Sequence, residues 1–176
     1  MRKFDNDCLL MCKIQGRIFE KSLLQCDSSS SVFIKRYMNS FPAYSMDRES
    51  FLIGSMSDDQ AIESINEEYP NSYGSEKYSN EEMYWIGYIY RYWSYVYEQR
   101  SKDIIKICSP KQLKELYYAY HSLDCKNAID RILEAKGAIV NAATSKDFTH
   151  YYITLPSLLQ VLFQKVLQGI MKVLMK

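Results

Sequence analysis

Residues 79–97 read SNEEMYWIGYIYRYWSYVY, and this stretch decides the fold class. Ser79 and Glu82 stand three positions apart as a capping box, and acidic residues favour the positive start of a helix. At about 100° per residue, the large apolar side chains that follow cover an arc of about 160°. They are Trp85, Ile86, Ile89, Tyr90, Tyr92, Trp93, Val96 and Tyr97. The stretch therefore predicts a long helix over residues 84–100.

A second, narrower stripe lies beside this arc. It consists of Tyr84, Tyr88 and Tyr95. Little is left for the remaining face beyond Gly87, Arg91, Ser94 and Glu98. A helix with so little polar surface is central to its fold, or it presents its second stripe to a partner. The sequence leaves both alternatives open.

Helix signals also dominate the rest of the chain. The predicted helices run over about 5–24, from the serines at 28–31 to Pro42, from Asp58 or Asp59 to Pro70, from Ser109, and from Asp124 to Gly137. Gly16 weakens the first of these by roughly 1 kcal/mol relative to Ala. Ser109-Pro110 with Gln112 is a strong start signal, because Ser caps, Pro suits the first turn and Gln completes the capping box. Residues 45–57 have no clear period, and a short strand is predicted over 151–155.

These elements predict an all-α fold, a compact bundle of about six to seven helices with an amphipathic C-terminal helix. Residues 1–137 form the expected helical domain, and residues 138–176 form a C-terminal extension. The last helix, over 158–176, has a broad apolar face with Lys165, Lys172 and Lys176 along one edge. Such a basic amphipathic helix docks on a partner, lies on a membrane surface or packs on the bundle. We expect it to be buried within the chain or in a homo-oligomer.

Composition excludes several classes. The chain has 176 residues, 22 Lys and Arg, and 21 Asp and Glu, so it suits one domain and is close to neutral. A dedicated nucleic-acid-binding domain would be clearly basic. The odd number of five Cys, the lack of a CxxC motif and the polar start of the chain favour a reducing cytoplasm. Cys8 and Cys12 share a helical face, but no third ligand follows them, so neither a metal site nor a cofactor is predicted.

The sequence contains little that favours catalysis. No phosphate-binding loop, nucleophile elbow or HExxH motif occurs. His121 has two interpretations: a general base oriented by Asp124, or, as we favour, a ring nitrogen that satisfies a helix end. The protein is therefore not expected to be an enzyme, and no catalytic residue is predicted.

A local excess of acids precedes the tyrosine-rich helix. Residues 58–82 hold eight acids and one lysine, a local charge of −7. The bland interpretation is a solvated helix face, and the functional one is a surface that docks a basic partner. The predicted partner-binding residues are Tyr84, Tyr88, Tyr95, Glu67, Glu68 and Glu81. Residues 83–115 carry a local charge of +3 among tyrosines, which is a weak signal for nucleic-acid binding. A nucleic-acid-linked role, such as an operon repressor, is therefore kept as the alternative function.

Four segments carry a resemblance to a known family. They are residues 33–40 (FIKRYMNS), residues 73–93 (from YGSEKYS to EMYWIGYIYRYW), residues 120–124 (YHSLD) and residues 128–133 (AIDRIL). Together they resemble a family of small, largely uncharacterised bacterial proteins, often encoded beside an ADP-ribosyltransferase-like protein as in toxin–antitoxin loci. The resemblance spans about residues 1–137, with Ala119 where the family pattern has Pro, and it carries no catalytic assignment. It implies a cytoplasmic, antitoxin-type protein that binds a toxin and covers its active groove.

Overall fold

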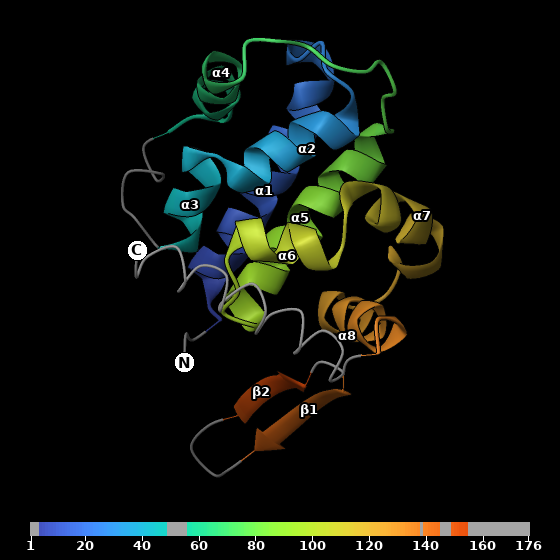
Figure 1. The fold of residues 1–176 in the computed structure, drawn as a ribbon. Coiled ribbons are helices and arrows are strands. Elements are labelled where there is room, and N and C mark those ends of the chain that lie inside the picture. Colours follow the sequence, from blue (N-terminus) through green and yellow to red (C-terminus); the bar gives the residue numbers. More distant parts are fainter. Residues whose placement is uncertain (1–3, 49–55, 138, 145–148, 155–176) are drawn as a thin grey trace, which may run out of the picture. The chain divides into compact units, whose positions relative to one another are not determined.

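The computed structural model describes residues 4–48, 56–137, 139–144 and 149–154. Within it the chain forms two compact units, Met1–Ile129 and Asp130–Lys176, and each is considered by itself (Figure 1). The predicted all-α bundle is confirmed, with eight helices among the described residues. None of these helices combines the length and the apolar composition needed to span a bilayer.

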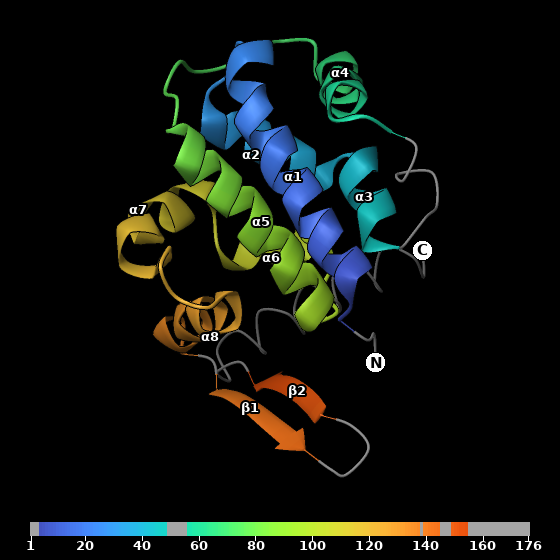
Figure 2. The ribbon, with the colours of Figure 1, turned by 180° about the vertical axis from the view of Figure 1, so that it is seen from behind.

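The first unit holds seven helices and the start of an eighth. In chain order they are α1 (Asn6–Gln25), α2 (Ser30–Asn39), α3 (Phe41–Asp47), α4 (Asp58–Glu68), α5 (Asn80–Val96), α6 (Ser101–Ile107), α7 (Pro110–Tyr120) and α8 (Cys125–Ala135). Helices α1 and α5 form the central pair, with α4 against α1 and α7 against α5. In Figure 2, α7, α5 and α1 follow one another across the view, and α4 is seen nearly end-on beyond the upper part of α1. Helices α2, α3 and α6 contact one another and cover the opposite side of the pair (Figure 1).

Two glycines allow α1 and α5 to approach closely. A Cβ atom on Gly87 would lie 2.7 Å from the carbonyl oxygen of Gln15 and 3.0 Å from the Cα atom of Gly16. A Cβ atom on Gly16 would lie 2.9 Å from the ring of Tyr84. Gly16, which weakens the helix on propensity alone, is therefore required by the packing of the two helices.

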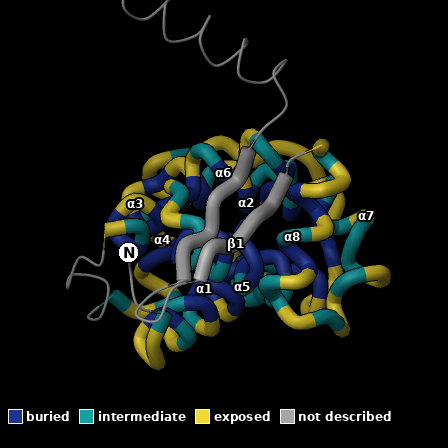
Figure 3. Tube along the Cα trace, turned by 90° about the horizontal axis from the view of Figure 1, so that it is seen from below, coloured by how far each residue is buried: buried dark blue, intermediate teal, exposed yellow. Residues whose placement is uncertain are grey.

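The core surrounds α5 on nearly every side. Its largest apolar side chains, among them Ile86, Ile89, Tyr90 and Trp93, are fully buried. Buried residues also recur at helical spacing along α1 and α2 (buried residues are dark blue in Figure 3). The helix is thus central to its fold, since even Gly87, Arg91 and Ser94 of its expected polar face are buried.

Arg91 on that face is fully buried. Its guanidinium forms an ion pair with Asp47 at 2.7 Å and donates hydrogen bonds to Gln15 at 2.9 Å and to Ser101 at 3.0 Å. Ser101 in turn donates to Asp47 through its backbone N–H and its hydroxyl. The network therefore joins α1, α3, α5 and α6 through one buried charge whose hydrogen bonds are satisfied.

The serines predicted to cap α2 have a different role. Ser29 occupies the cap position, but its side chain makes no cap hydrogen bond. Instead the N–H groups of Ser29 and Ser30 donate to the carbonyls of Tyr73 and Glu76, each at 2.9 Å. Lys77 donates to two carbonyls just before α2. The serine cluster therefore holds the α4–α5 loop against the start of α2.

Helix boundaries differ from the predicted ones at three places. Pro42 lies in the first turn of α3 and does not close α2. Ser57, with Gln60, caps α4 one residue before Asp58. Helix α5 ends at Val96 because Glu98 adopts a left-handed conformation with φ of 50°, and the unpredicted helix α6 follows.

The second unit contains the end of α8 and an antiparallel hairpin. Strand β1 (Ile139–Thr144) pairs with β2 (Thr149–Thr154), and Ile139 lies opposite Thr154. The strand predicted over 151–155 corresponds to β2, whereas β1 was not predicted. The predicted boundary after Gly137 lies beyond the end of α8. The amphipathic helix predicted over 158–176 lies outside the described residues.

Candidate functional site

The three tyrosines of the predicted second stripe occupy different environments. Tyr95 is only 4% exposed, and its hydroxyl donates to the carbonyl of Met46 at 3.2 Å. It belongs to the core and is not a surface residue. Tyr88 is half-buried and packs against the cluster that Tyr95 forms with Cys8 and Cys12. Tyr84 is half-buried on the other side of Tyr88, with the two ring centroids 6.3 Å apart.

The predicted acidic surface is divided into separate parts. Asp58 and Asp59 form ion pairs with Arg17 and Lys21 of α1. Glu76 pairs with Lys114 at 3.2 Å, and Glu82 completes the α5 capping box. The exposed acids of residues 58–82 that do not take part in these contacts lie in two places. Glu63, Glu67 and Glu68 are on α4, and Glu81 is at the start of α5.

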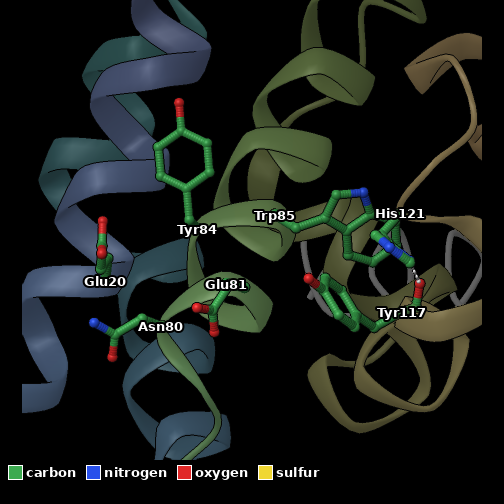
Figure 4. A pocket seen from close by; sticks show the side chains of 7 residues that line it. All are labelled: Glu20, Asn80, Glu81, Tyr84, Trp85, Tyr117 and His121. Carbon is green, nitrogen blue, oxygen red and sulfur yellow. Dashed lines mark hydrogen bonds between the residues drawn. The ribbon is translucent and has the colours of Figure 1, made fainter.

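A pocket of about 380 Å³ lies between α1, α5 and α7 and contains two of the predicted site residues, Glu81 and Tyr84. Its lining residues are Glu20, Asn80, Glu81, Tyr84, Trp85, Tyr117 and His121 (Figure 4). Glu20 belongs to α1. The four lining residues from Asn80 to Trp85 belong to the start of α5, Tyr117 belongs to α7, and His121 is the C-terminal cap of α7. The pocket therefore combines two carboxylates with aromatic rings from two helices.

The carboxylate of Glu81 is held in its charged form. Hydrogen bonds from its own backbone N–H and from the Ser79 hydroxyl lower the pKa of Glu81. Its place in the first turn of α5 adds the favourable end of the helix dipole. Neither Glu81 nor Glu20 has an ion-pair partner in the part of the chain that the structure describes. The pocket therefore carries uncompensated negative charge.

Aromatic rings form the opposite side of the pocket. Trp85 meets Tyr117 edge to face with centroids 5.6 Å apart, and the ring of His121 stacks on Tyr117 at 4.7 Å. Partial burial raises the pKa of Tyr117, and the charges of Glu81 and Glu82 raise it further. Tyr118 continues the ring cluster outward and is 80% exposed. A wide apolar and aromatic surface thus reaches solvent beside the carboxylates.

His121 does not have the arrangement of a general base. Its Nδ1 lies 2.9 Å from the carbonyl oxygen of Tyr117, and because a carbonyl only accepts, this contact requires a proton on Nδ1. Asp124 is engaged elsewhere, since its Oδ1 accepts from the N–H groups of Lys126 and Asn127 at the start of α8. The ring nitrogen of His121 therefore satisfies a helix end, as the favoured interpretation predicted.

A second pocket, of about 630 Å³, lies where α4 meets the end of α1. It is lined by Gln25, Asp59, Ile62, Glu63, Asn66 and Glu67. Hydrogen bonds from Gln25 and Lys21 lower the pKa of Asp59. The site holds no aromatic ring, and one of its acids is already neutralised by Lys21. Glu68 lies outside both pockets.

The metal site that was not predicted and the nucleic-acid alternative can also be compared with the side-chain arrangement. Within the described ranges, no group of three His, Cys, Asp or Glu residues is placed to hold a metal ion. Four of the six basic residues in 83–115 are buried or already form ion pairs. Arg91 is buried, Arg100 and Lys106 pair with Asp103, and Lys114 pairs with Glu76. The basis for the nucleic-acid alternative is correspondingly weaker.

Two residues of the first pocket, Glu81 and Tyr84, were predicted from the sequence as partner-binding residues, and the other lining residues were not. Glu20, Trp85 and Tyr117 belong to three helices, and no local pattern relates residues so far apart in the chain. Comparison with models of known protein families, with curated protein sequences and with solved structures gives no match. The chemistry of the pocket is therefore the structural feature that bears on function.

Proposed function

We propose that the protein is an antitoxin-type binding protein that neutralises a partner toxin by covering the toxin's active groove. The pocket between α1, α5 and α7 is the observation that carries this proposal. It places two carboxylates, which have no ion-pair partner among the described residues, beside half-buried and exposed aromatic rings. That combination suits recognition of a basic protein surface, because Tyr and Trp anchor interfaces and complementary charge speeds the encounter.

Two exposed side chains extend the proposed docking surface beyond the pocket. Tyr118 is 80% exposed on α7, and Leu24 is 94% exposed on α1. Leu24 stands one helical turn after Glu20, so the two share a face of α1. Exposed large apolar side chains that border a pocket are typical of interaction sites. The resemblance to proteins encoded beside ADP-ribosyltransferase-like proteins favours a partner of that class.

Co-expression with the products of the adjacent genes tests the proposal. The toxic product should arrest growth alone, and growth should recover with this protein, which should co-purify with the toxin. Tyr118→Ala should weaken the complex by at least about fivefold, the effect of losing about 1 kcal/mol at an aromatic anchor. Tyr44→Ala is the matched control, since Tyr44 is also exposed but lies on α3, away from the pocket. Absence of both rescue and co-purification contradicts the proposal.

A further inference from the structure

The first pocket has the chemistry of a site for an organic cation. Glu20 and Glu81 provide negative charge, and no lysine or arginine of the described residues lines the pocket to neutralise it. Tyr84, Trp85 and Tyr117 also line it, with the rings of Trp85 and Tyr117 lying together and the ring of Tyr84 pointing away from them (Figure 4). An aromatic ring attracts a cation to its face, and the attraction grows when the cation is partly desolvated.

A guanidinium fits these groups better than an ammonium does. It is planar, so it can stack on a ring while its N–H groups reach carboxylates in its own plane. The pocket's two kinds of wall, carboxylates on one side and rings on the other, offer both interactions to one planar group. Its volume of about 380 Å³ lies within the range of roughly 300–1,000 Å³ for small-ligand sites. A single arginine side chain with some water fills such a space.

The protein already uses this pairing in its own packing. The guanidinium of Arg36 lies over the rings of Tyr69 and Tyr73, at 5.3 and 5.5 Å from their centroids. Arg48 lies over Tyr44 at 4.5 Å. In the pocket the rings and carboxylates are present, and no arginine of the described chain supplies the cation. Among the described residues, the pocket therefore has no cation of its own.

We propose that this pocket receives an arginine side chain of the partner protein. The inference rests on the proposed function, because it identifies the residue type by which the docking surface recognises its partner. The arginine guanidinium stacks against the Trp85 and Tyr117 side of the pocket and directs its N–H groups toward Glu81 and Glu20. Tyr118 and Leu24 then contact the partner surface around the inserted side chain.

Indole N–H signals in a nitrogen-15 NMR titration test the inference directly. The chain has two tryptophans, and each occupies a distinct environment. Trp85 lines the pocket, whereas Trp93 is buried and donates its indole N–H to Gln99 at 3.0 Å. The probe is N-acetyl-arginine amide at low salt. The Trp85 signal should shift and saturate while the Trp93 signal stays in place and reports that the fold is intact.

Matched probes and variants separate charge from shape. The citrulline analogue, which has nearly the same shape and no charge, should give no saturable shift, and the lysine analogue should bind more weakly than the arginine one. Glu81→Gln and Glu20→Gln should each weaken binding about 2- to 5-fold, the range for a partly exposed ion pair. Glu67→Gln, in the other pocket, should leave binding unchanged. If Glu81→Gln disturbs the cap of α5, the Trp93 signal should shift in that variant. The Glu20→Gln variant then decides whether the carboxylates contribute to arginine binding.

The outcomes also distinguish this inference from the proposed function. Equal binding of the citrulline or lysine probe, or no saturable shift of Trp85, overturns the arginine site. If this protein rescues growth and co-purifies with the toxin but does not bind the probe, the arginine site alone is overturned. If the arginine probe binds saturably but this protein rescues growth from no adjacent gene product and co-purifies with none, the site stands and the antitoxin proposal is overturned.

Discussion

Arg91 holds its charge in the interior of the first unit, where its side chain has no exposure to solvent. Removing a guanidinium from water is costly, and the cost is offset here by Asp47, Gln15 and Ser101, which satisfy its N–H groups. The helices that provide these groups are fixed relative to one another by the same contacts. The network therefore acts as a geometric constraint on the bundle and is not simply a source of stability.

Replacing Arg91 should be among the most damaging single changes. Arg91→Leu leaves the Asp47 carboxylate, 9% exposed, without its cation, and breaking a buried pair in this way costs about 3–5 kcal/mol. Chemical denaturation of the variant measures the loss in free energy of unfolding. Arg100→Leu is the control, because it removes an exposed pair with Asp103 and should cost less than about 1 kcal/mol. Similar losses for the two variants would contradict the structural role of the network.

The burial of Arg91 could not have been predicted from local sequence. At 100° per residue it falls on the narrow face left by two apolar stripes, where a charge is ordinarily solvated. Its partners Gln15 and Asp47 lie 76 and 44 residues away. Only the packing of α1 and α3 on that face converts an expected exposed residue into the centre of a network.

At the scale of helices, the predictable features were the ones that need only neighbouring residues. The capping boxes of Ser79 with Glu82 and of Ser109 with Gln112 are both present, and Asp124 caps α8 as expected. These contacts form within a single turn, so local sequence determines them. Helix α6 was missed because its cap, Arg100, makes no side-chain hydrogen bond and gives no start signal.

The crossing of α1 and α5 gives a second prediction. In an ordinary helix interior Gly→Ala is stabilising by about 1 kcal/mol. Gly87→Ala should instead destabilise the protein by about 1–3 kcal/mol, since the new methyl meets the backbone of Gln15 at 2.7 Å and the helices must separate. Thermal unfolding followed by circular dichroism measures the change.

Gly16→Ala and Ala119→Gly calibrate that result. Gly16→Ala should cost less than Gly87→Ala, because its closest contacts, the Tyr84 ring at 2.9 Å and the Tyr84 carbonyl oxygen at 3.0 Å, are less tight than the 2.7 Å at Gly87. Ala119 is exposed on α7, so Ala119→Gly should show the propensity effect alone, a loss of about 1 kcal/mol. A stabilised Gly87→Ala variant would mean that the two helices do not cross at these glycines.

For the whole molecule, sixteen tyrosines make stability sensitive to alkaline pH. Burial raises the pKa of Tyr37, Tyr88 and Tyr90 above the ordinary value of 10.0. Burial and the charge of Asp124 raise the pKa of Cys125 to about 11. The folded state therefore favours the neutral form of each group. Its contribution to stability is complete below the unfolded pKa and is lost as the pH rises above it.

We therefore expect the denaturation midpoint to hold steady to about pH 9 and to fall increasingly above pH 10. Each buried phenol that ionises only on unfolding removes about 1.4 kcal/mol per pH unit in that range. Tyr90→Phe, compared with wild type across this pH series, should flatten the decline, whereas Tyr118→Phe, at an exposed position, should not. A midpoint that falls equally steeply in all three proteins would contradict the burial of Tyr90.

The candidate site was partly predictable at this scale. The sequence marks Glu81 and Tyr84 as binding residues because acids and tyrosines follow one another there, and both line the first pocket. The same reasoning also included Tyr95, which packing removes to the core. The accessible stripe of an apolar helix is determined by the helices that pack against it. The pattern within the helix itself does not contain this information.

The central pair of helices also constrains how the protein is made. Gln15 and Arg91 are 76 residues apart, so α1 leaves the ribosome well before α5 exists. At an elongation rate of roughly 5–20 residues per second, the delay is roughly 4 to 15 seconds. During that interval the glycine-bearing side of α1 has no native partner and is available to a chaperone or to another nascent chain. Slower translation of the segment between them would lengthen this exposure, so synonymous codon changes over residues 26–79 should alter the soluble yield without altering the protein.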